Sequence, residues 1–392
     1  PLEPVGESLV EQLWIKDLSG SPDGAECSFV LRHHVLEEWD EEPFRGEFRT
    51  RQPALARHYL DNGGRTLHLL DVQFVVPPID PARLAEQLDR AVPEEELLEL
   101  AEAREVESLL AFYDWAFDRV DTLAGGMISQ IAVPELWTRH VHLVPDVWSK
   151  VAEWCRQTGN RFLVADCAPP LAVLQEEEQN KARAEGYLLT DEELSPAALV
   201  PWYRAEHWRI WGADVPAEVA LTLDALEATQ EILRLRELTL SCIAVYWPWV
   251  QSLRGLDLPP SGAMAGVYAR NDWEQGPVGV MKSPANEQVK AVFDLSLHID
   301  EQPLNLLRRA GVNLLTPKIG KGVIVWGART QCEDDIWKFV NVRRLIGYIG
   351  KQLEVDNQWA VFEENTDELR ARVARDARYF LTSLWEKGAL VG

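Results

Sequence analysis

The sequence of 392 residues lacks the long apolar runs and leader segments that mark membrane and exported proteins. No stretch approaches the ~20 consecutive apolar residues that a membrane span needs. No basic segment followed by an apolar one opens the chain, as it would in a signal peptide. We therefore expect no membrane span, and we expect the chain to stay in the cytoplasm or to leave only when the cell lyses.

Cysteines are few, and their number is odd. The five are widely scattered, with no C-x-x-C pair that could hold a metal or a redox disulfide: Cys27, Cys155, Cys167, Cys242 and Cys332. We expect buried free thiols at these positions.

Basic residues are also outnumbered by acidic ones, 39 against 63, which gives a formal net charge of −24. Nucleic acid binding needs a basic face, so this balance argues against a nucleic acid partner. Residues 261–392 hold 17 basic and 17 acidic residues, and by subtraction residues 1–260 hold 22 and 46. The acidic part either keeps the protein soluble or faces a different neighbour from the neutral part.

Catalytic and metal-binding motifs are missing as well. Neither G-x-S-x-G nor H-E-x-x-H occurs in the sequence. The histidine pairs His33-His34 and His140 with His142 have no carboxylate or cysteine at a ligand spacing. The sequence therefore predicts no catalytic, cofactor-binding or metal-binding residues, no cofactor and no reaction class.

What the sequence does contain is an alternation of helical and strand patterns, which is typical of an α/β fold. The composition of residues 1–45, with Gly, Pro and acidic clusters, predicts irregular peripheral structure. Patterns beyond them predict helix at 53–60, a turn at 61–64, strand at 66–72, helix at 80–122 and a short apolar run at 128–133. They then predict a helix at 148–155 that ends near Gly159, and a strand at 161–165.

Residues 171–240 interrupt this rhythm with acidic clusters and amphipathic spacing, which predict a mostly helical insertion. A strand is expected at 243–250, where Pro248 must lie at an edge or a bulge because it cannot donate to the ladder.

The final third has the clearest pattern. It predicts strands at 312–315 and 322–326 that flank a Gly320-Lys321-Gly322 turn, and a helix capped by Asn341. It also predicts a strand at 358–362 and a last helix with a capping box of Asn365 and Glu368. We therefore expect four parts: 1–45 peripheral; 46–170 with 241–257 as an acidic outer α/β domain; 171–240 as the insertion; and 258–392 as an α/β C-terminal domain with a mixed sheet flanked by two amphipathic helices.

Several segments of this last part closely resemble the C-terminal domain of phage tail sheath proteins, in the family's order. They are PPSGAMAGVYAR at 259–270, KSPAN at 282–286, GVIVWGART at 322–330, WKFVNVRRL at 337–345, QWAVFE at 358–363 and LWEKGAL at 384–390. Weaker similarity extends over 50–170 and 240–257. None is visible over 1–45 and 171–240.

The resemblance implies a structural protein and not an enzyme: a sheath subunit that stacks in hexameric rings as a helical sleeve around an inner tube and stores the energy of contraction. It implies as partners other copies of itself, the inner tube protein, and baseplate and cap proteins, with the C-terminal domain facing the tube. The particle would be a phage tail or a released injection machine, assembled in the bacterial cytoplasm. In that family, terminal arms lend strands to neighbouring subunits, and the absence of such arms here leads us to expect trimmed ends.

Two alternatives stay open at this point. The chain could be a sheath-like cap or baseplate-joining component of the same machine, or an α/β enzyme with an unrecognised active site.

Basic residues on the last two helices are the candidate interface. At 100° per residue, Arg372, Arg375 and Arg378 lie opposite the apolar stripe of the last helix. Arg344 and Lys351, with the adjacent Arg343, are the candidates on the helix before it. These ridges are either solvated faces or contacts with acidic groups of the tube or of another subunit.

Overall fold

A computed structural model describes residues 9–16, 26–36, 52–75, 128–204, 209–210, 213–234 and 237–390, with single positions between 93 and 120. The chain divides into two compact units, Pro1–Phe48 with Arg65–Met127, and Arg49–Gly64 with Ile128–Gly392. Most of the helix predicted at 80–122 lies outside the described residues. In the described part of the chain, no helix combines the length and apolar character needed to cross a membrane.

The first unit contains an antiparallel sheet in the order β1-β2-β3, formed by Leu9–Lys16, Glu26–Leu36 and Leu67–Val75. Phe29 of β2 pairs with Leu13 of β1 and with Phe74 of β3. β3 confirms the predicted strand, but the prediction of irregular structure over 1–45 is wrong for β1 and β2. Both strands are rich in β-branched, aromatic and leucine residues, which outweigh the nearby Gly and Pro.

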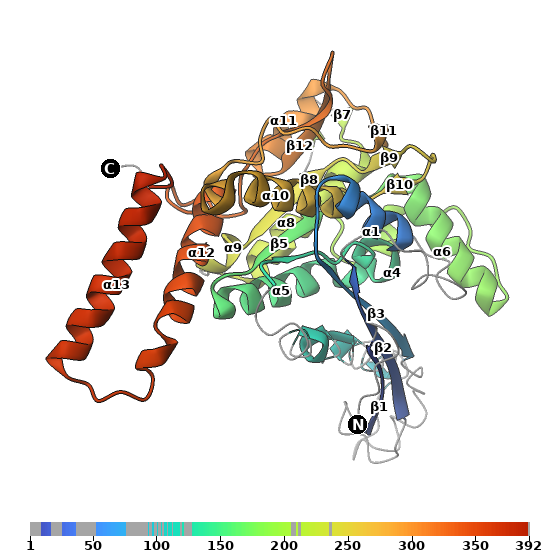
Figure 1. The fold of residues 1–392 in the computed structure, drawn as a ribbon. Coiled ribbons are helices and arrows are strands. Elements are labelled where there is room, and N and C mark those ends of the chain that lie inside the picture. The colour runs from blue at the N-terminus through green and yellow to red at the C-terminus, as the bar shows by residue number, and fades with distance from the viewer. Residues whose placement is uncertain are drawn as a thin grey trace. The chain divides into compact units, whose positions relative to one another are not determined.

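The second unit is built on a five-stranded sheet in the order β13-β12-β8-β5-β4. Its strands are β4 (Gln130–Ile131), β5 (Phe162–Asp166), β8 (Ile243–Trp247), β12 (Asn313–Lys318) and β13 (Gly322–Trp326). All neighbours are parallel except the β12–β13 hairpin. Gly320 and Gly322 take φ values of 76° and 70° at the hairpin turn, as the predicted turn requires. The predicted α/β fold is confirmed (Figure 1).

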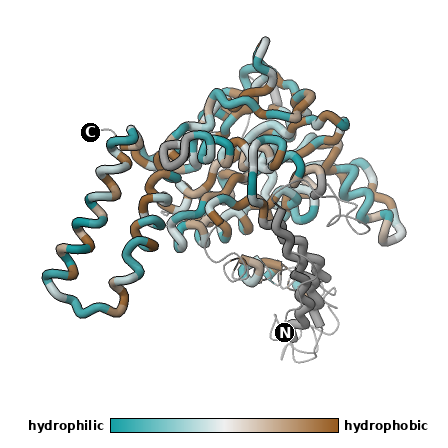
Figure 2. Tube along the Cα trace, in the orientation of Figure 1, coloured by the Kyte–Doolittle hydropathy of each residue, from teal (hydrophilic) through white to brown (hydrophobic). Residues whose placement is uncertain are grey.

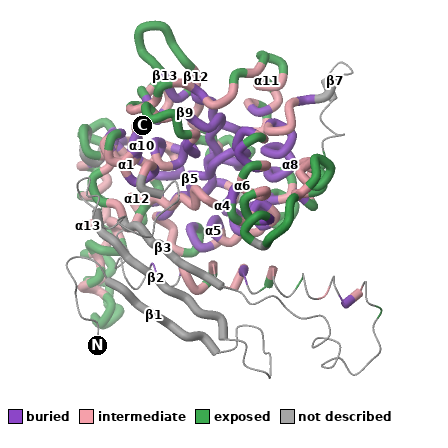
Figure 3. Tube along the Cα trace, turned by 90° about the vertical axis from the view of Figure 1, so that its right-hand side faces the viewer, coloured by how far each residue is buried: buried purple, intermediate pink, exposed green. Residues whose placement is uncertain are grey.

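Helices cover this sheet, and its central strands are buried on both faces. α10 (Ser261–Gln275) and α1 (Gln52–Asp61) pack together, and their side chains Tyr268 and Leu55 belong to one core with Phe162, Tyr246 and Leu315 of the strands. α5 (Val144–Thr158) packs against β5, and α8 (Ala217–Ile232) packs against α5. Figure 3 shows the buried residues concentrated in these elements.

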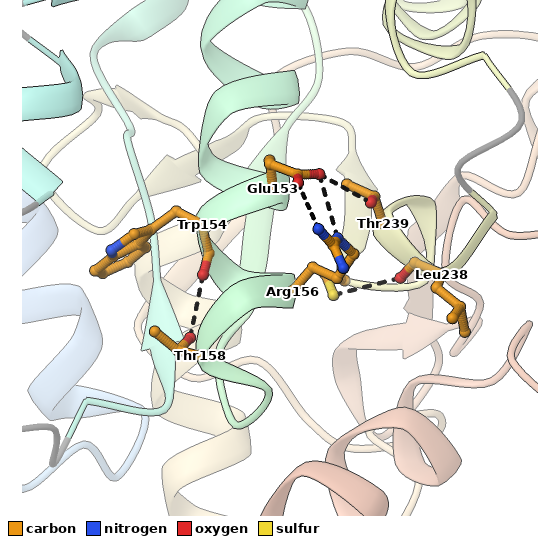
Figure 4. Close-up of polar contacts among 7 residues, drawn as sticks. Glu153, Trp154, Arg156, Thr158, Leu238 and Thr239 are labelled. Atoms are coloured by element: carbon orange, nitrogen blue, oxygen red, sulfur yellow. Dashed lines mark hydrogen bonds and ion pairs between the residues drawn. The ribbon is translucent and has the colours of Figure 1, made fainter.

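The C-terminal end of α5 is tied to the short helix α9 (Glu237–Leu240), which leads into β8. Glu153 accepts hydrogen bonds from Arg156 at 2.6 Å and from Thr239 at 3.2 Å (Figure 4). Gly159 then ends α5 in the left-handed region, where the sequence predicted the helix to stop.

The predicted insertion is mostly helical, as expected. Besides α8 and α9 it holds α6 (Leu171–Glu185), α7 (Pro196–Leu199) and a short hairpin of β6 (Arg209–Ile210) and β7 (Ala213–Asp214). Other short elements are α4 (Leu136–Arg139), η2 (Val141–Leu143), η4 (Gly276–Met281) and α11 (Glu301–Arg309).

Strand boundaries near Pro248 differ from the prediction. β8 ends at Trp247, and the chain continues after Pro248 into β9 (Val250–Ser252), which belongs to a second sheet with β10 (Asp257–Leu258) and β11 (Val292–Leu295). β12 pairs with β8, so strands from both sides of residue 258 lie in one sheet.

The last two helices are α12 (Val340–Asp356) and α13 (Asp367–Glu386). The predicted strand at 358–362 is wrong, because a 3-10 turn, η5 (Gln358–Ala360), connects the helices. The predicted caps also shift by one or two residues. Phe339 and not Asn341 precedes α12, and the hydroxyl of Thr366, not the side chain of Asn365, accepts from the Leu369 amide at 3.1 Å.

Four of the five cysteines are described, and all four are buried and free of disulfides: Cys155, Cys167, Cys242 and Cys332. The expectation of buried thiols is confirmed at these positions. Burial raises the pKa of the Cys155 and Cys167 thiols well above the usual value, so both stay protonated and behave as packing groups.

Candidate subunit interface

The helix α13 is the least buried long element of the described chain. Of its twenty residues, only Leu384 is buried, at 1% exposure. The apolar side chains predicted to form its inner stripe are otherwise half-buried: Leu369, Val373, Ala377, Phe380 and Leu381. Figure 1 shows α13 as an outer element of its unit, connected to the rest through α12. The apolar stripe of α13 is therefore only partly covered by the rest of the described chain.

Two ring contacts join α13 to α12 and to η5. The rings of Tyr348 and Phe380 lie 6.3 Å apart. The Arg372 guanidinium lies 3.9 Å from the ring centroid of Trp359, a cation–π distance. Hydrophobic and hydrophilic residues alternate along both helices of this α12–α13 hairpin (Figure 2), and Ile346, Val355 and Trp385 are exposed.

A shallow groove of about 410 Å³ runs along one face of α13. Its lining is Ala374, Ala377, Arg378, Leu381, Thr382 and Trp385. Trp385 is 54% exposed. Arg378 forms no ion pair with any residue that the structure describes. The groove thus combines apolar lining residues with one arginine, Arg378, that has no ion-pair partner in the described chain.

Arg343, one of the predicted interface residues, is instead part of the interior. It is 9% exposed and donates hydrogen bonds to the Gly159 carbonyl at 3.3 Å and to the Cys242 sulfur at 3.2 Å. These contacts attach the first turn of α12 to the end of α5 and the start of β8. Arg343 is therefore a packing residue of this chain.

Arg344 is also 9% exposed, and it is bound by α10. Its guanidinium donates to Asp272 at 2.5 Å and lies 4.6 Å from the ring of Tyr268. A helical projection places Arg344 opposite the stripe of its own helix, but α10 occupies that side. These contacts fix the first turn of α12 to α10.

The remaining predicted residues are more accessible. Lys351 pairs with Glu354 at 3.2 Å, and Arg375 lies 3.3 Å from Asp376, both local ion pairs of the kind that contribute little to stability. Lys351 and Arg375, together with Arg372 and Arg378, are four cations of the α12–α13 hairpin. In the described chain, each has at most one local ion pair. The structure separates the six predicted residues into a buried pair, the half-buried Lys351 and three exposed arginines.

Sequence reasoning missed the partners that decide this division. Trp359 was placed in a strand, and Asp272 lies in a segment for which no helix was predicted. The sequence did hold one signal for the partner of Arg344, because Asp272 is an acidic residue one turn beyond Tyr268 in a helical stretch. However, no local pattern connects Arg344 with a residue 72 positions earlier. Within the described residues, no group of three or more His, Cys, Asp or Glu is arranged to hold a metal ion.

Comparison with known proteins bears on this arrangement. Residues 238–331, which include β8, α10, α11, β12 and β13, match the family model described as the phage tail sheath protein central domain. A putative prophage major tail sheath protein of Pseudomonas aeruginosa (strain UCBPP-PA14) is 29% identical over 139 residues. That match covers 34% of this chain and 35% of the relative, so the chain matches about a third of the relative's length.

Solved structures are similar over most of the chain. A chain of the anti-feeding prophage (AFP) baseplate has a TM-score of 0.56 at 22% identity, over 92% of this chain and 74% of that chain. The chain has the fold of a contractile sheath protein. The AFP helical sheath in its contracted state gives a TM-score of 0.54 at 23% identity, with the same coverages. The contracted sheath complex of the extracellular contractile injection system PVC gives 0.54 at 20%, over 92% and 73%.

The predicted resemblance to tail sheath proteins is thereby confirmed. The family match ends at residue 331, before α12 and α13 begin. The matches to solved structures extend further, over 92% of the chain.

Proposed function

We propose that this protein is a structural sheath subunit that assembles with other copies of itself into a contractile helical sleeve. The observation that carries the proposal is the sheath fold ending in a helix, α13, whose apolar stripe is left open in the single chain. Such a helix is stabilised when a neighbour covers it, at roughly 25 cal/mol for each Å² of apolar surface buried. The function is mechanical, so its site is a contact surface and not a reaction centre.

The exposed cations of the hairpin are the proposed contact with the inner tube. Lys351, Arg372, Arg375 and Arg378 lie on the surface, and their local partners leave much of their charge available. Single exposed ion pairs are weak. Repeated over many subunits of a sleeve, they would hold the extended state in register. The buried Arg343 and Arg344 hold α12 in place instead and are the less suited of the six.

The four-part division predicted from sequence belongs to this proposal, with residues 258–392 facing the tube and the acidic part of the chain on the outer side. Baseplate and cap proteins are the proposed partners at the ends of the sleeve. The proposed setting is the bacterial cytoplasm during assembly, and afterwards a phage tail or released injection particle.

The test is assembly of the protein with its tube protein, observed by negative-stain microscopy. We expect the wild type to form tubes of regular diameter. Reversal of three charges, Arg372→Glu with Arg375→Glu and Arg378→Glu, should abolish full-length extended particles, because like charges would then face the tube. Normal yields of extended particles from the triple variant would contradict the tube contact. A stable wild-type monomer under every assembly condition would contradict the sheath function itself.

A sheath-like component that joins the sleeve to the baseplate is the second candidate. The observation that favours it is the similarity to a chain in the AFP baseplate structure. Such a component would form single rings and no extended tubes, which the same micrographs distinguish.

A further inference from the structure

A second groove lies far from the tip of the hairpin, at the carboxyl end of β13 and the amino end of α12. It has a volume of about 820 Å³, and its apolar lining includes Val312, Trp326, Ala328 and Phe339. Trp326 and Phe339 are 47% and 39% exposed, although Lys318 Nζ already lies 4.0 Å from the ring centroid of Trp326, a cation–π distance. The groove therefore offers open aromatic surface on a part of the chain that is otherwise well packed.

Three arginines line the same groove: Arg308, Arg309 and Arg329. Arg308 is neutralised by Glu301 at 2.7 Å. Arg309 and Arg329 are exposed, and neither guanidinium has an ion-pair partner in the described part of the chain. Two uncommitted cations beside open aromatic rings predict a ligand that carries both carboxylates and an apolar group.

The loop between α12 and α13 has the complementary chemistry. Phe362 is 99% exposed, so its ring contacts almost nothing in its own chain. Glu363 and Glu364 follow it directly, are exposed, and form no ion pair with a described residue. Thus one aromatic ring and two free carboxylates project together from the end of the hairpin.

The two features of one chain cannot meet. Phe339 lines the groove directly before α12, whereas Phe362 follows α12 by six residues. The 17 residues of this helix hold the two ends ~25 Å apart at 1.5 Å per residue. The loop can therefore reach the groove only on another copy of the chain.

We infer that the α12–α13 loop of one copy docks in the β13–α12 groove of a second copy, with Phe362 among the apolar lining and Glu363 and Glu364 on Arg309 and Arg329. The contact joins different surfaces of two identical chains, so it continues from copy to copy, into a closed ring or an open helix according to the rotation between copies. This inference rests on the proposed self-assembly and names one contact within it.

Two charge-reversal variants test the contact. The groove variant carries Arg309→Glu and Arg329→Glu, and the loop variant carries Glu363→Arg and Glu364→Arg. A control, Arg183→Glu with Arg234→Glu, changes the net charge as the groove variant does, at exposed arginines that have only local contacts. Circular dichroism and thermal unfolding establish that each variant is folded. Arg309→Ala with Arg329→Ala replaces the groove variant if it does not fold.

The assembled fraction is measured by sedimentation. Each reversed variant alone should assemble at least tenfold less than wild type, because its groove and loop carry like charges. An equimolar mixture should regain assembly with equal amounts of both chains, since each loop then finds a groove of opposite charge on the other variant. Wild-type assembly by either variant alone, or no recovery in the mixture, overturns the contact while leaving the sheath function standing.

A direct binding measurement separates this inference from the proposed function. A labelled peptide of residues 358–370 is titrated with wild-type protein, and binding is followed by fluorescence anisotropy. We expect at least tenfold weaker binding by the groove variant, unchanged binding by the control, and weaker binding at 1 M salt, where screening is short-ranged. Equal binding by wild type and groove variant overturns the contact, whether or not the wild type assembles.

Discussion

Two helices of the same unit, α8 and α13, differ sharply in how much of their apolar surface the chain itself covers. Nine of the 16 residues of α8 are buried, whereas one of the 20 residues of α13 is buried. Both have apolar side chains at helical spacing. The difference shows that α8 is held by the fold, while the stripe of α13 is suited to a surface that the single chain does not provide.

The largest expected effect is on the free energy of unfolding, and it is found by comparing one Leu→Ala substitution in each helix. Leu223→Ala in α8, where Leu223 is 1% exposed, should lower the free energy of unfolding by about 2–5 kcal/mol because it leaves a cavity in the core. Leu381→Ala in α13 should lower it by less than about 1 kcal/mol, because that side chain is only partly buried in the single chain.

Urea denaturation of the purified protein measures both changes. Leu381→Ala should also reduce assembly, which Leu223→Ala should do only through loss of folded protein. Equal destabilisation by the two substitutions would mean that α13 is packed in the free chain, contrary to the comparison.

The next largest effect is a pH dependence of stability that comes from a buried carboxylate. Like α8, this carboxylate is covered by the chain itself. Asp166, at the end of β5, accepts hydrogen bonds from the Ser261 amide and hydroxyl at 2.6 Å each, and it is 2% exposed. Burial raises the pKa of Asp166 from 3.8 to about 7, against the opposing effect of these hydrogen bonds. Between these pH values the folded state binds more protons than the unfolded state, so the free energy of unfolding falls as pH rises.

Asp166→Asn should remove this pH dependence, which amounts to about 2 kcal/mol between pH 5 and pH 8. Chemical denaturation at several pH values measures it. Ser261→Ala should act in the opposite sense, because loss of the hydroxyl donor raises the pKa of Asp166 further. A pH profile of Asp166→Asn identical to that of wild type would refute the assignment.

The smallest effect concerns the start of α13. Thr366→Ala removes the hydroxyl that accepts from the Leu369 amide and should cost about 1 kcal/mol of helix stability. Asn365→Ala is the matched control, since the Asn365 side chain accepts only from the exposed Arg370. Amide hydrogen exchange over residues 367–372 should quicken in the threonine variant alone. Faster exchange in Asn365→Ala than in Thr366→Ala would restore the cap that the sequence suggested.

Sequence patterns predicted the parts of the fold that depend on local chemistry. Helix α5 with its end at Gly159, strand β5 and the hairpin with Gly320 and Gly322 all follow from periodicity and turn residues. The same reasoning failed at 358–362, because a short apolar run fits a strand or a helical turn equally well. It also missed β1 and β2, where flanking Gly and acidic residues obscured the strand pattern.

The candidate interface was predictable only in part. A helical wheel predicts Arg372 and Arg378 opposite the apolar stripe, and both are exposed, but Arg378 lines a groove together with Ala377 and Leu381 of that stripe. The wheel considers one helix at a time. Arg343 and Arg344 are buried by residues from α5, β8 and α10, which the sequence separates from them by 72 to 184 positions. No local pattern carries that information.

The attachment of α12 has a mechanical consequence. Arg344 bonded to Asp272 and Arg343 bonded to Gly159 clamp the first turn of this helix at two sides of the sheet. A stiff arm with a clamped base behaves as a lever. A push on the far end of the hairpin would reach α5 and α10, and the sheet that they cover, through these two contacts.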